Sequence, residues 1–279
     1  MTFREYLSRY KYLLLTTICL LLAVYSSIIS AMARQWLDDG NYSHGFLIPL
    51  IAGYFVWKNS KALMAATVEP WNPGLLVIIF GVCQLLLGYL AGELFTMRSS
   101  FVVVLIGVSL YLFGGGVFRI LRLPLLYLIL MVPIPYIIYN SIAFPLKLFV
   151  TRMSVGILKL LGIAVIREGN IIMLPSVVLE VADACSGMRS LVSLLAIAVS
   201  YAFLIQTTTA KRWLIVVSAV PIAIMTNSFR VIFTGILAQY WSEKAAQDFF
   251  HEFTGMVVFV ISMMLLVGIG AALRKEGDL

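Results

Sequence analysis

The sequence is poor in charged residues, cysteine and histidine. Only 12% of its 279 residues are charged, whereas about a quarter are charged in an average soluble domain. The three cysteines, Cys19, Cys83 and Cys185, are an odd number without paired spacing, which argues against a disulfide framework and against a zinc site. The two histidines, His44 and His251, are too few for a metal cluster. We therefore expect neither a metal nor another cofactor.

Apolar residues make up 62% of the chain, and apolar runs near 20 residues recur along its whole length. This pattern predicts an all-α polytopic membrane protein, with membrane lipids around it. A formal net charge of +7 is compatible with nucleic-acid binding. The basic residues, however, lie at the ends of apolar runs, where they act as topology signals, so we expect no nucleic acid as a partner.

We expect one membrane-embedded domain over residues 1–279, without internal repeats and with about eight transmembrane helices. They are expected at about 12–31, 43–57, 73–92, 99–118, 123–140, 187–206, 213–239 and 254–273. The first run is longer than a usual signal-peptide core, although a signal-peptidase-like site follows it. We interpret it as an uncleaved helix. The fifth is uncertain because Pro124, Pro133 and Pro135 break or bend helices.

The distribution of Lys and Arg predicts the orientation in the membrane. With the N-terminus in the cytoplasm, eleven basic residues lie in cytoplasmic loops or termini, and nine of the thirteen acids lie outside. Both termini are then cytoplasmic, in an inner (cytoplasmic) membrane. The basic residues are Arg4, Arg9, Lys11, Lys58, Lys61, Arg119, Arg122, Lys211, Arg212, Arg274 and Lys275.

Residues 144–165 do not fit the pattern of a membrane span. Lys147, Arg152 and Lys159 recur among apolar residues, and burying three cations in a bilayer would be costly. We expect an amphipathic helix in the outer interface. The following β-branched residues and the Pro175-Ser176 break predict a short hairpin or extended loop outside the membrane.

The segment "EVADACSGMRSLVSLL" places charged residues where a span begins. Asp183 or Ser186 is expected to cap the helix, which leaves Cys185 at a helix N-terminus that favours the thiolate. Arg189, four residues on, would add a positive field from the same helical face. The alternative is a small packing residue, which is the interpretation preferred for the other two cysteines.

Arg230 lies well inside the seventh expected span, in "IAIMTNSFRVIFTGILA". An arginine within a span usually faces the bundle interior and is a functional candidate. Asn227, one turn earlier on the same helical face, could orient it. The alternative is a structural ion pair with an acid of the outer loops.

His251 lies at the outer start of the last span, in "FFHEFTGMVVF". A histidine could take a proton from a thiol and later donate one to a leaving group. Under the predicted topology Cys185, Arg230 and His251 share the outer level, and such a set suits acyl transfer. His44, in "NYSHGFLIP", is expected to be interfacial or structural, with a supporting role in substrate binding as the other possibility.

The segments "ADACSGMRS", "TNSFR" and "HEFTG", together with the early "YSHG", resemble the exosortase/archaeosortase family. The resemblance implies a multi-pass cysteine transpeptidase or protease. Its substrates would be exported proteins with a C-terminal sorting signal, in which a short motif such as Pro-Glu-Pro precedes a membrane helix and a basic tail. A histidine at the third position favours the bacterial exosortases, in a short form without a fused C-terminal domain.

The resemblance also implies roles for individual residues. Cys185 would be the nucleophile, Arg230 its cationic partner and His251 the acid/base, with Arg189 and Asn227 in support. The resulting hypothesis is cleavage of the sorting signal at the periplasmic face through a thioester.

Three alternatives stay open for the function. A transporter would explain an intramembrane arginine and proline-broken helices, but the polar residues gather at the outer level instead of the midplane. A scaffold for surface polysaccharide export would need no catalysis. An intramembrane serine protease is disfavoured because the sequence contains no Gly-x-Ser-x-Gly motif.

Overall fold

The computed structural model describes residues 1–175, 177–181, 187–206, 208–240 and 249–274, with side chains at all of them except 238, 240 and 249–252. The protein is 83% helical with little sheet, which confirms an all-α polytopic membrane protein. The chain divides into two compact units, Met1–Pro135 and Tyr136–Leu279. Each unit is described by itself, and the single domain over residues 1–279 stays a prediction.

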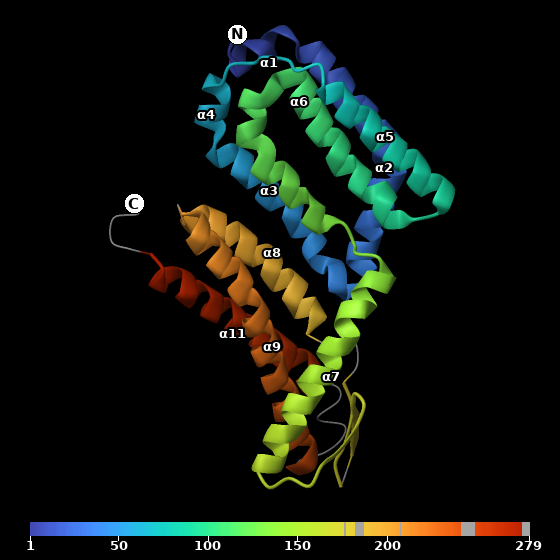
Figure 1. Cartoon of the computed structure of the whole chain (residues 1–279), viewed down its shortest axis with the longest axis vertical. Helices are drawn as coiled ribbons and strands as arrows, with labels where there is room; N and C mark the ends of the chain where they lie inside the picture. Colours follow the sequence, from blue (N-terminus) through green and yellow to red (C-terminus); the bar gives the residue numbers. More distant parts are fainter. Residues whose placement is uncertain (176, 182–186, 207, 241–248, 275–279) are drawn as a thin grey trace. The chain divides into compact units, whose positions relative to one another are not determined.

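Unit 1 is entirely helical in the residues that the structure describes (Figure 1). Its helices are α1 Phe3–Arg9, α2 Lys11–Asp38, η1 Gly40–Phe46, α3 Leu47–Lys58, α4 Ser60–Ala65, α5 Gly74–Ala91, α6 Leu94–Tyr127 and η2 Leu128–Met131. With 12 residues, α3 is much shorter than a usual membrane span.

Both the start of α6 and the segment after its end lie at the C-terminal end of α2. Near the start, the Nη1 of Arg98 donates a hydrogen bond to Oε1 of Gln35 at 2.6 Å. After the end, Nε1 of Trp36 donates to the carbonyl of Met131 at 3.0 Å. α6 must therefore cross unit 1 and return.

The return point of α6 is Gly114, at the opposite end of the unit. There the N–H of Glu69 donates to the carbonyl of Phe113 at 3.2 Å, and the N–H of Val68 donates to that of Met1 at 3.0 Å. Gly114 has φ +78° and ψ −176°, a conformation open essentially only to glycine. α6 is thus a helical hairpin, and Figure 1 shows its two legs running in different directions.

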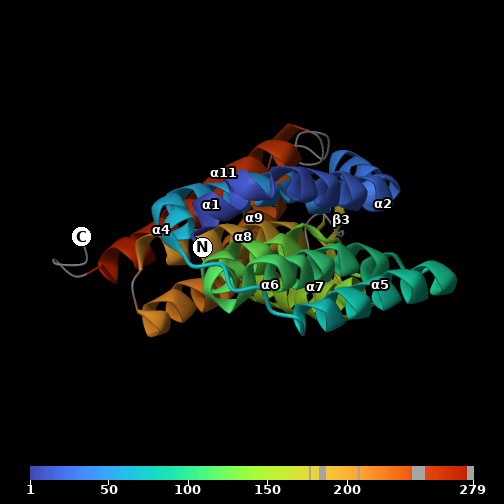
Figure 2. The same cartoon turned by 90° about the horizontal axis from the view of Figure 1, so that it is seen from above.

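The first leg of α6 packs closely on α5, and the two run side by side in both views (Figures 1 and 2). Gly74, Gly81 and Gly88 of α5 are buried and seven residues apart. They face Tyr111, Val104 and Met97 of α6 in turn. Small residues at this spacing let two membrane helices approach closely without relying on the hydrophobic effect.

The two ends of unit 1 carry opposite charge. Seven basic residues lie at or near the end that holds Met1 and Gly114, with Glu5 and Glu69 among them, and they are Arg4, Arg9, Lys11, Lys58, Lys61, Arg119 and Arg122. The other end holds Asp38, Asp39 and Glu93, together with Arg34 and Arg98.

Unit 2 combines four long helices with a small sheet. Its elements are α7 Tyr136–Leu160, β1 Ile166–Glu168, β2 Ile171–Met173, β3 Val178–Glu180, α8 Met188–Ile205, α9 Thr209–Tyr240 and α11 Phe249–Ala272. The strands form an antiparallel sheet in the order β1-β2-β3. The short hairpin predicted after residue 165 is therefore present, with one strand more than expected.

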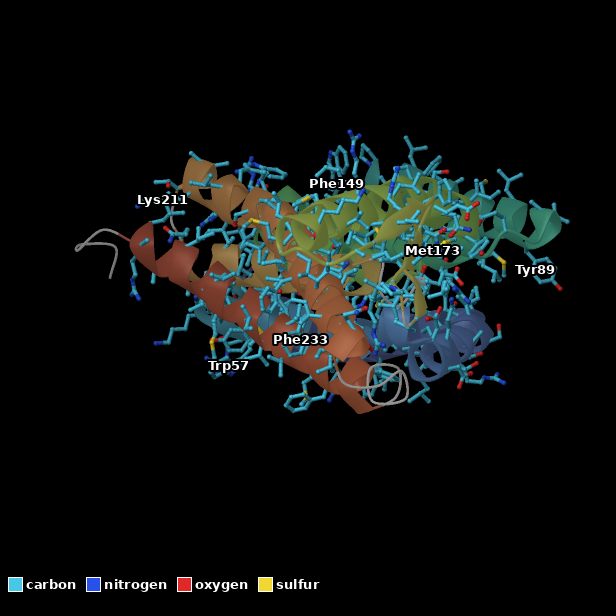
Figure 3. All side chains as sticks on the ribbon, turned by 90° about the horizontal axis from the view of Figure 1, so that it is seen from below. Trp57, Tyr89, Phe149, Met173, Lys211 and Phe233 are labelled. Atoms are coloured by element: carbon cyan, nitrogen blue, oxygen red, sulfur yellow. The ribbon has the colours of Figure 1, made fainter. Side chains whose placement is uncertain are left out.

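Two apolar clusters hold unit 2 together. One joins α7 and the sheet to Val231 and Ile232 of α9, and it includes Ile172 of β2. The other joins α8, α9 and α11 and includes Leu194 and Leu266. Phe149 of α7 and Phe233 of α9, labelled in Figure 3, are exposed, as expected for side chains that face lipid.

Seven helices of the described residues are long and apolar enough to cross a membrane, with α6 counted once. The predicted spans near 99–118 and 123–140 are wrong in their boundaries, because the two legs of α6 meet at Gly114 and helical structure ends at Met131. Pro133 and Pro135 interrupt the chain before α7, since proline lacks the N–H that a helix interior requires.

The helix predicted over residues 144–165 is not a separate element, and its place in the outer interface stays a prediction. These residues continue the helix that begins at Tyr136, and α7 ends at Leu160. By length and composition α7 is itself a candidate span. Arg152 and Lys159 lie on its exposed side, while Thr151, Ser154 and Leu158 are buried, so the helix is amphipathic without being a separate element.

Candidate functional site

The start of α8 packs against α9 through Gly187 and Asn227. Gly187 is the N-cap of α8 and has φ +83°, a left-handed conformation that favours glycine. A Cβ at this position would lie 3.1 Å from Cγ and Nδ2 of Asn227. Asn227 is almost fully buried, at 1% exposure. The backbone two residues after Cys185 therefore rests directly on the Asn227 amide.

The start of α11 packs against α9 through Gly255 and Arg230. A Cβ at Gly255 would lie 3.2 Å from both Cζ and Nη2 of Arg230. Arg230 is buried, with 9% of its surface exposed. The guanidinium group therefore occupies the space that a side chain at Gly255 would need, one helical turn after His251.

Three segments far apart in the sequence thus meet around Asn227 and Arg230: the start of α8, the "TNSFR" part of α9 and the start of α11. Further along the bundle, Oγ1 of Thr226 and Oγ of Ser262 are 2.8 Å apart, and Nε2 of Gln206 donates to the carbonyl of Gly270. The first contact joins α9 to α11, and the second joins the end of α8 to α11.

Several predicted site residues fall outside the described part of the chain. They are Asp183, Cys185 and Ser186, and the side chain of His251. The distances among the sulfur, the guanidinium and the imidazole stay predictions.

The predicted capping of α8 is wrong. The helix begins at Met188 with Gly187 as its N-cap, and no side chain of the described residues caps it. Neither Asp183 nor Ser186 is the N-cap residue. Arg189 is exposed on the first turn. Because the helix starts after Cys185, the i to i+4 relation between Cys185 and Arg189 does not apply.

His44 lies in unit 1, in η1, and is half-buried. Its Nδ1 is buried and has no hydrogen-bond partner among the described residues. Burial lowers the pKa of His44 below its ordinary value, while hydrogen bonding to the carbonyl groups of Leu130 and Asn41 acts in the opposite direction. Burial therefore disfavours the charged form of the imidazole. Its supporting role in substrate binding stays a prediction.

Arg98 is a second buried arginine, which the sequence analysis missed. Only 6% of its surface is exposed, and its bond to Gln35 ties α6 to α2. The sequence signal that could have identified it was an arginine on the second turn of an apolar span.

Cys19 and Cys83 are exposed on α2 and α5. No group of three or more His, Cys, Asp or Glu in the described residues could hold a metal.

The contact between Gly187 and Asn227 leads to a first prediction. Gly187→Ala is expected to lower the free energy of unfolding by about 1–3 kcal/mol more than Gly162→Ala. Gly162 also has a positive φ, +78°, so both substitutions put an alanine into a left-handed conformation at a similar cost. The two positions differ in their surroundings, because a Cβ at Gly162 meets nothing within 4 Å. Thermal unfolding of the two variants in detergent measures the difference. Equal melting temperatures would contradict the tight contact.

The family model described as "Transmembrane exosortase (Exosortase_EpsH)" matches residues 36–268, which include the segments around His44, Gly187, Arg230 and Gly255. The searches among curated proteins and solved structures gave no match.

Proposed function

The chain belongs to the transmembrane exosortase family, and on that premise we propose that it is a membrane cysteine transpeptidase or protease. It cleaves the C-terminal sorting signal of exported proteins at the outer face of the cytoplasmic membrane, through a thioester on Cys185. Its partners are exported proteins that carry such a signal after their folded part, as a short motif, an apolar helix and a basic tail.

The observation that carries this proposal is the meeting of three segments in unit 2. Gly187 contacts Asn227, and Gly255 contacts Arg230. Cys185 precedes Gly187 by two residues, and His251 precedes Gly255 by four. The proposal brings a thiol, a cation and an imidazole together from these three segments, and this is the set of groups that acyl transfer requires.

The chemistry proceeds in two steps. The Cys185 thiolate attacks the carbonyl carbon of the scissile peptide bond, and the C–N bond breaks as His251 donates a proton to the leaving amine. Arg230 stabilises the negative charge on the carbonyl oxygen in the tetrahedral intermediate, where one well-placed donor contributes about 3–4 kcal/mol. An acceptor amine or water then attacks the thioester and releases the cysteine.

The charge distribution supports an orientation with the site outside. In unit 2, Lys211 and Arg212 lie at the start of α9 and Arg274 follows α11, at the end opposite Gly255 (Lys211 is labelled in Figure 3). In unit 1 the basic residues lie near Met1. The positive-inside rule puts both basic ends, and both termini, in the cytoplasm. The site then faces the periplasm.

Trapping of the thioester tests the proposal. A tagged exported protein ending in a Pro-Glu-Pro segment, an apolar helix and a basic tail is co-expressed with the enzyme, and the membranes are treated with hydroxylamine. We expect release of the substrate as a hydroxamate at the cleavage site, because hydroxylamine attacks thioesters. Cys19→Ala and Cys83→Ala serve as matched controls that keep this product, whereas Cys185→Ala abolishes it.

The same experiment separates the enzyme from a transporter or a non-catalytic scaffold. Either alternative leaves the substrate uncut in every variant. Cleavage that survives Cys185→Ala would rule out the covalent step. Labelling of Cys185 by a thiol-directed reagent is expected to weaken in Arg230→Gln, because the loss of a nearby cation raises the pKa of a thiol.

A further inference from the structure

Strand β3 lies at an edge of the sheet that the described residues form, close in sequence to Cys185. β3 is an edge strand, because the sheet order among the described residues is β1-β2-β3. An edge strand presents a row of N–H and C=O groups that an additional strand can pair with. α7 packs against β1 and β2.

The hydrogen-bond pattern identifies which groups face the free edge. The carbonyl of Val177 accepts from the N–H of Leu174 at 2.9 Å, and the N–H of Val181 donates to the carbonyl of Asn170 at 3.0 Å. Residues 177 and 181 therefore direct their backbone groups toward β2. Since the direction alternates along an antiparallel strand, Val178 and Glu180 direct theirs away from β2.

The sheet is held beside the part of α9 that carries Arg230. Val177 and Val181, which flank β3, are buried in the same apolar cluster as Val231 and Ile232. On the other face of the strand Val178 is 59% exposed, and Glu180 is exposed as well. One side of β3 is thus anchored next to the arginine, and no further strand of the described residues pairs with its other edge.

We propose that the outward N–H and C=O groups of Val178 and Glu180 bind the sorting motif of the substrate as an added antiparallel or parallel strand. This inference rests on the proposed function, because it states where the substrate of that function binds. An extended peptide pairs with an exposed edge through main-chain hydrogen bonds, and alternate side chains supply specificity. Because proline has no N–H, the glutamate of a Pro-Glu-Pro motif is the residue that would direct its N–H and C=O groups toward β3. Glu180 precedes Cys185 by five residues, a stretch that extends over at most about 18 Å.

This arrangement also accounts for how a peptide bond reaches the thiolate. Added strands hold the main chain extended, and an extended chain exposes its carbonyl groups to attack. Because the chain from Glu180 to Cys185 spans at most about 18 Å, residues paired with Val178 and Glu180 would lie within about five positions of the scissile bond. The recognised segment and the cleaved bond are then separate parts of one extended stretch.

A proline scan of the two sheet edges provides the first test. Val178→Pro removes one outward N–H, which an edge strand tolerates, and is expected to lower processing of the tagged Pro-Glu-Pro substrate about 10-fold. Arg167→Pro is the matched control, because the register of β1 with β2 directs the N–H of Arg167 to the opposite edge.

Disulfide crosslinking tests docking independently of catalysis. In a Cys185→Ala background, Val178→Cys is paired with single cysteines placed along the substrate motif, and adducts are measured after oxidation with copper phenanthroline. We expect adducts at alternate substrate positions, at least about 5-fold stronger than at the positions between, following the period of two along a strand. Arg167→Cys is expected to give none above background.

The outcomes distinguish the two proposals. Adducts without the alternation, or no more adduct from Val178→Cys than from Arg167→Cys, would overturn docking on β3 even where hydroxylamine traps a thioester. Equal processing by Val178→Pro and wild type would do the same. An alternating pattern without a trapped thioester would support docking and remove the cysteine chemistry instead.

Discussion

Replacing Arg230 by glutamine is expected to lower the rate of substrate processing about 100- to 1,000-fold. Arg230 is buried, and its guanidinium lies against Gly255 at the start of α11. Glutamine keeps hydrogen-bond donors but loses the charge that stabilises an oxyanion. Arg230→Lys keeps the charge on a differently shaped group and should recover only part of the rate. Quantitative immunoblots of cleaved and uncut substrate measure the effect.

A second substitution displaces the Arg230 guanidinium without replacing the arginine itself. Gly255→Val is expected to lower processing about 100-fold, because the new side chain displaces the guanidinium and a misplacement near 1 Å costs that much. Gly268→Val on the same helix is the matched control, since a Cβ at Gly268 meets nothing within 4 Å. Wild-type rates in Gly255→Val would show that the position of Arg230 is unimportant for the reaction.

Gly114→Ala is expected to lower the free energy of unfolding by about 3 kcal/mol. Its φ of +78° and ψ of −176° are closed to alanine, and a Cβ there would collide with the carbonyl oxygen of Glu69. The apparent melting temperature in detergent should fall by about 6–12 °C.

The neighbouring glycine is a control for that prediction. A Cβ at Gly115 meets nothing within 4 Å, and its φ is not positive. Gly115→Ala should therefore be neutral or slightly stabilising, because alanine favours a helix over glycine. Similar melting temperatures for the two variants would mean that α6 does not turn at Gly114.

The sequence was sufficient to predict the long helices and the burial of Arg230. Apolar runs of spanning length have few alternatives in a chain this hydrophobic, and an arginine among them must face the protein interior. The turn of α6 was predictable too, because Gly114, Gly115 and Gly116 stand in a row, but the expected span of 99–118 was drawn across them.

The contacts of the candidate site were beyond sequence reasoning. That Gly255 faces Arg230, and Gly187 faces Asn227, depends on how α8, α9 and α11 pack, and helical periodicity specifies a face without naming its partner. The cap of α8 was missed for a local reason. Asp183 and Ser186 are good N-cap types, but the left-handed Gly187 starts the helix later.

The spacing of Gly74, Gly81 and Gly88 restricts how α5 can change in evolution. All three sit against α6, and each added residue rotates the remainder of a helix by about 100°. One inserted residue between Gly81 and Gly88 would turn Gly88 away and bring a side chain into the narrow contact. We therefore expect natural variants of this helix to differ by substitution at its exposed positions and not by length.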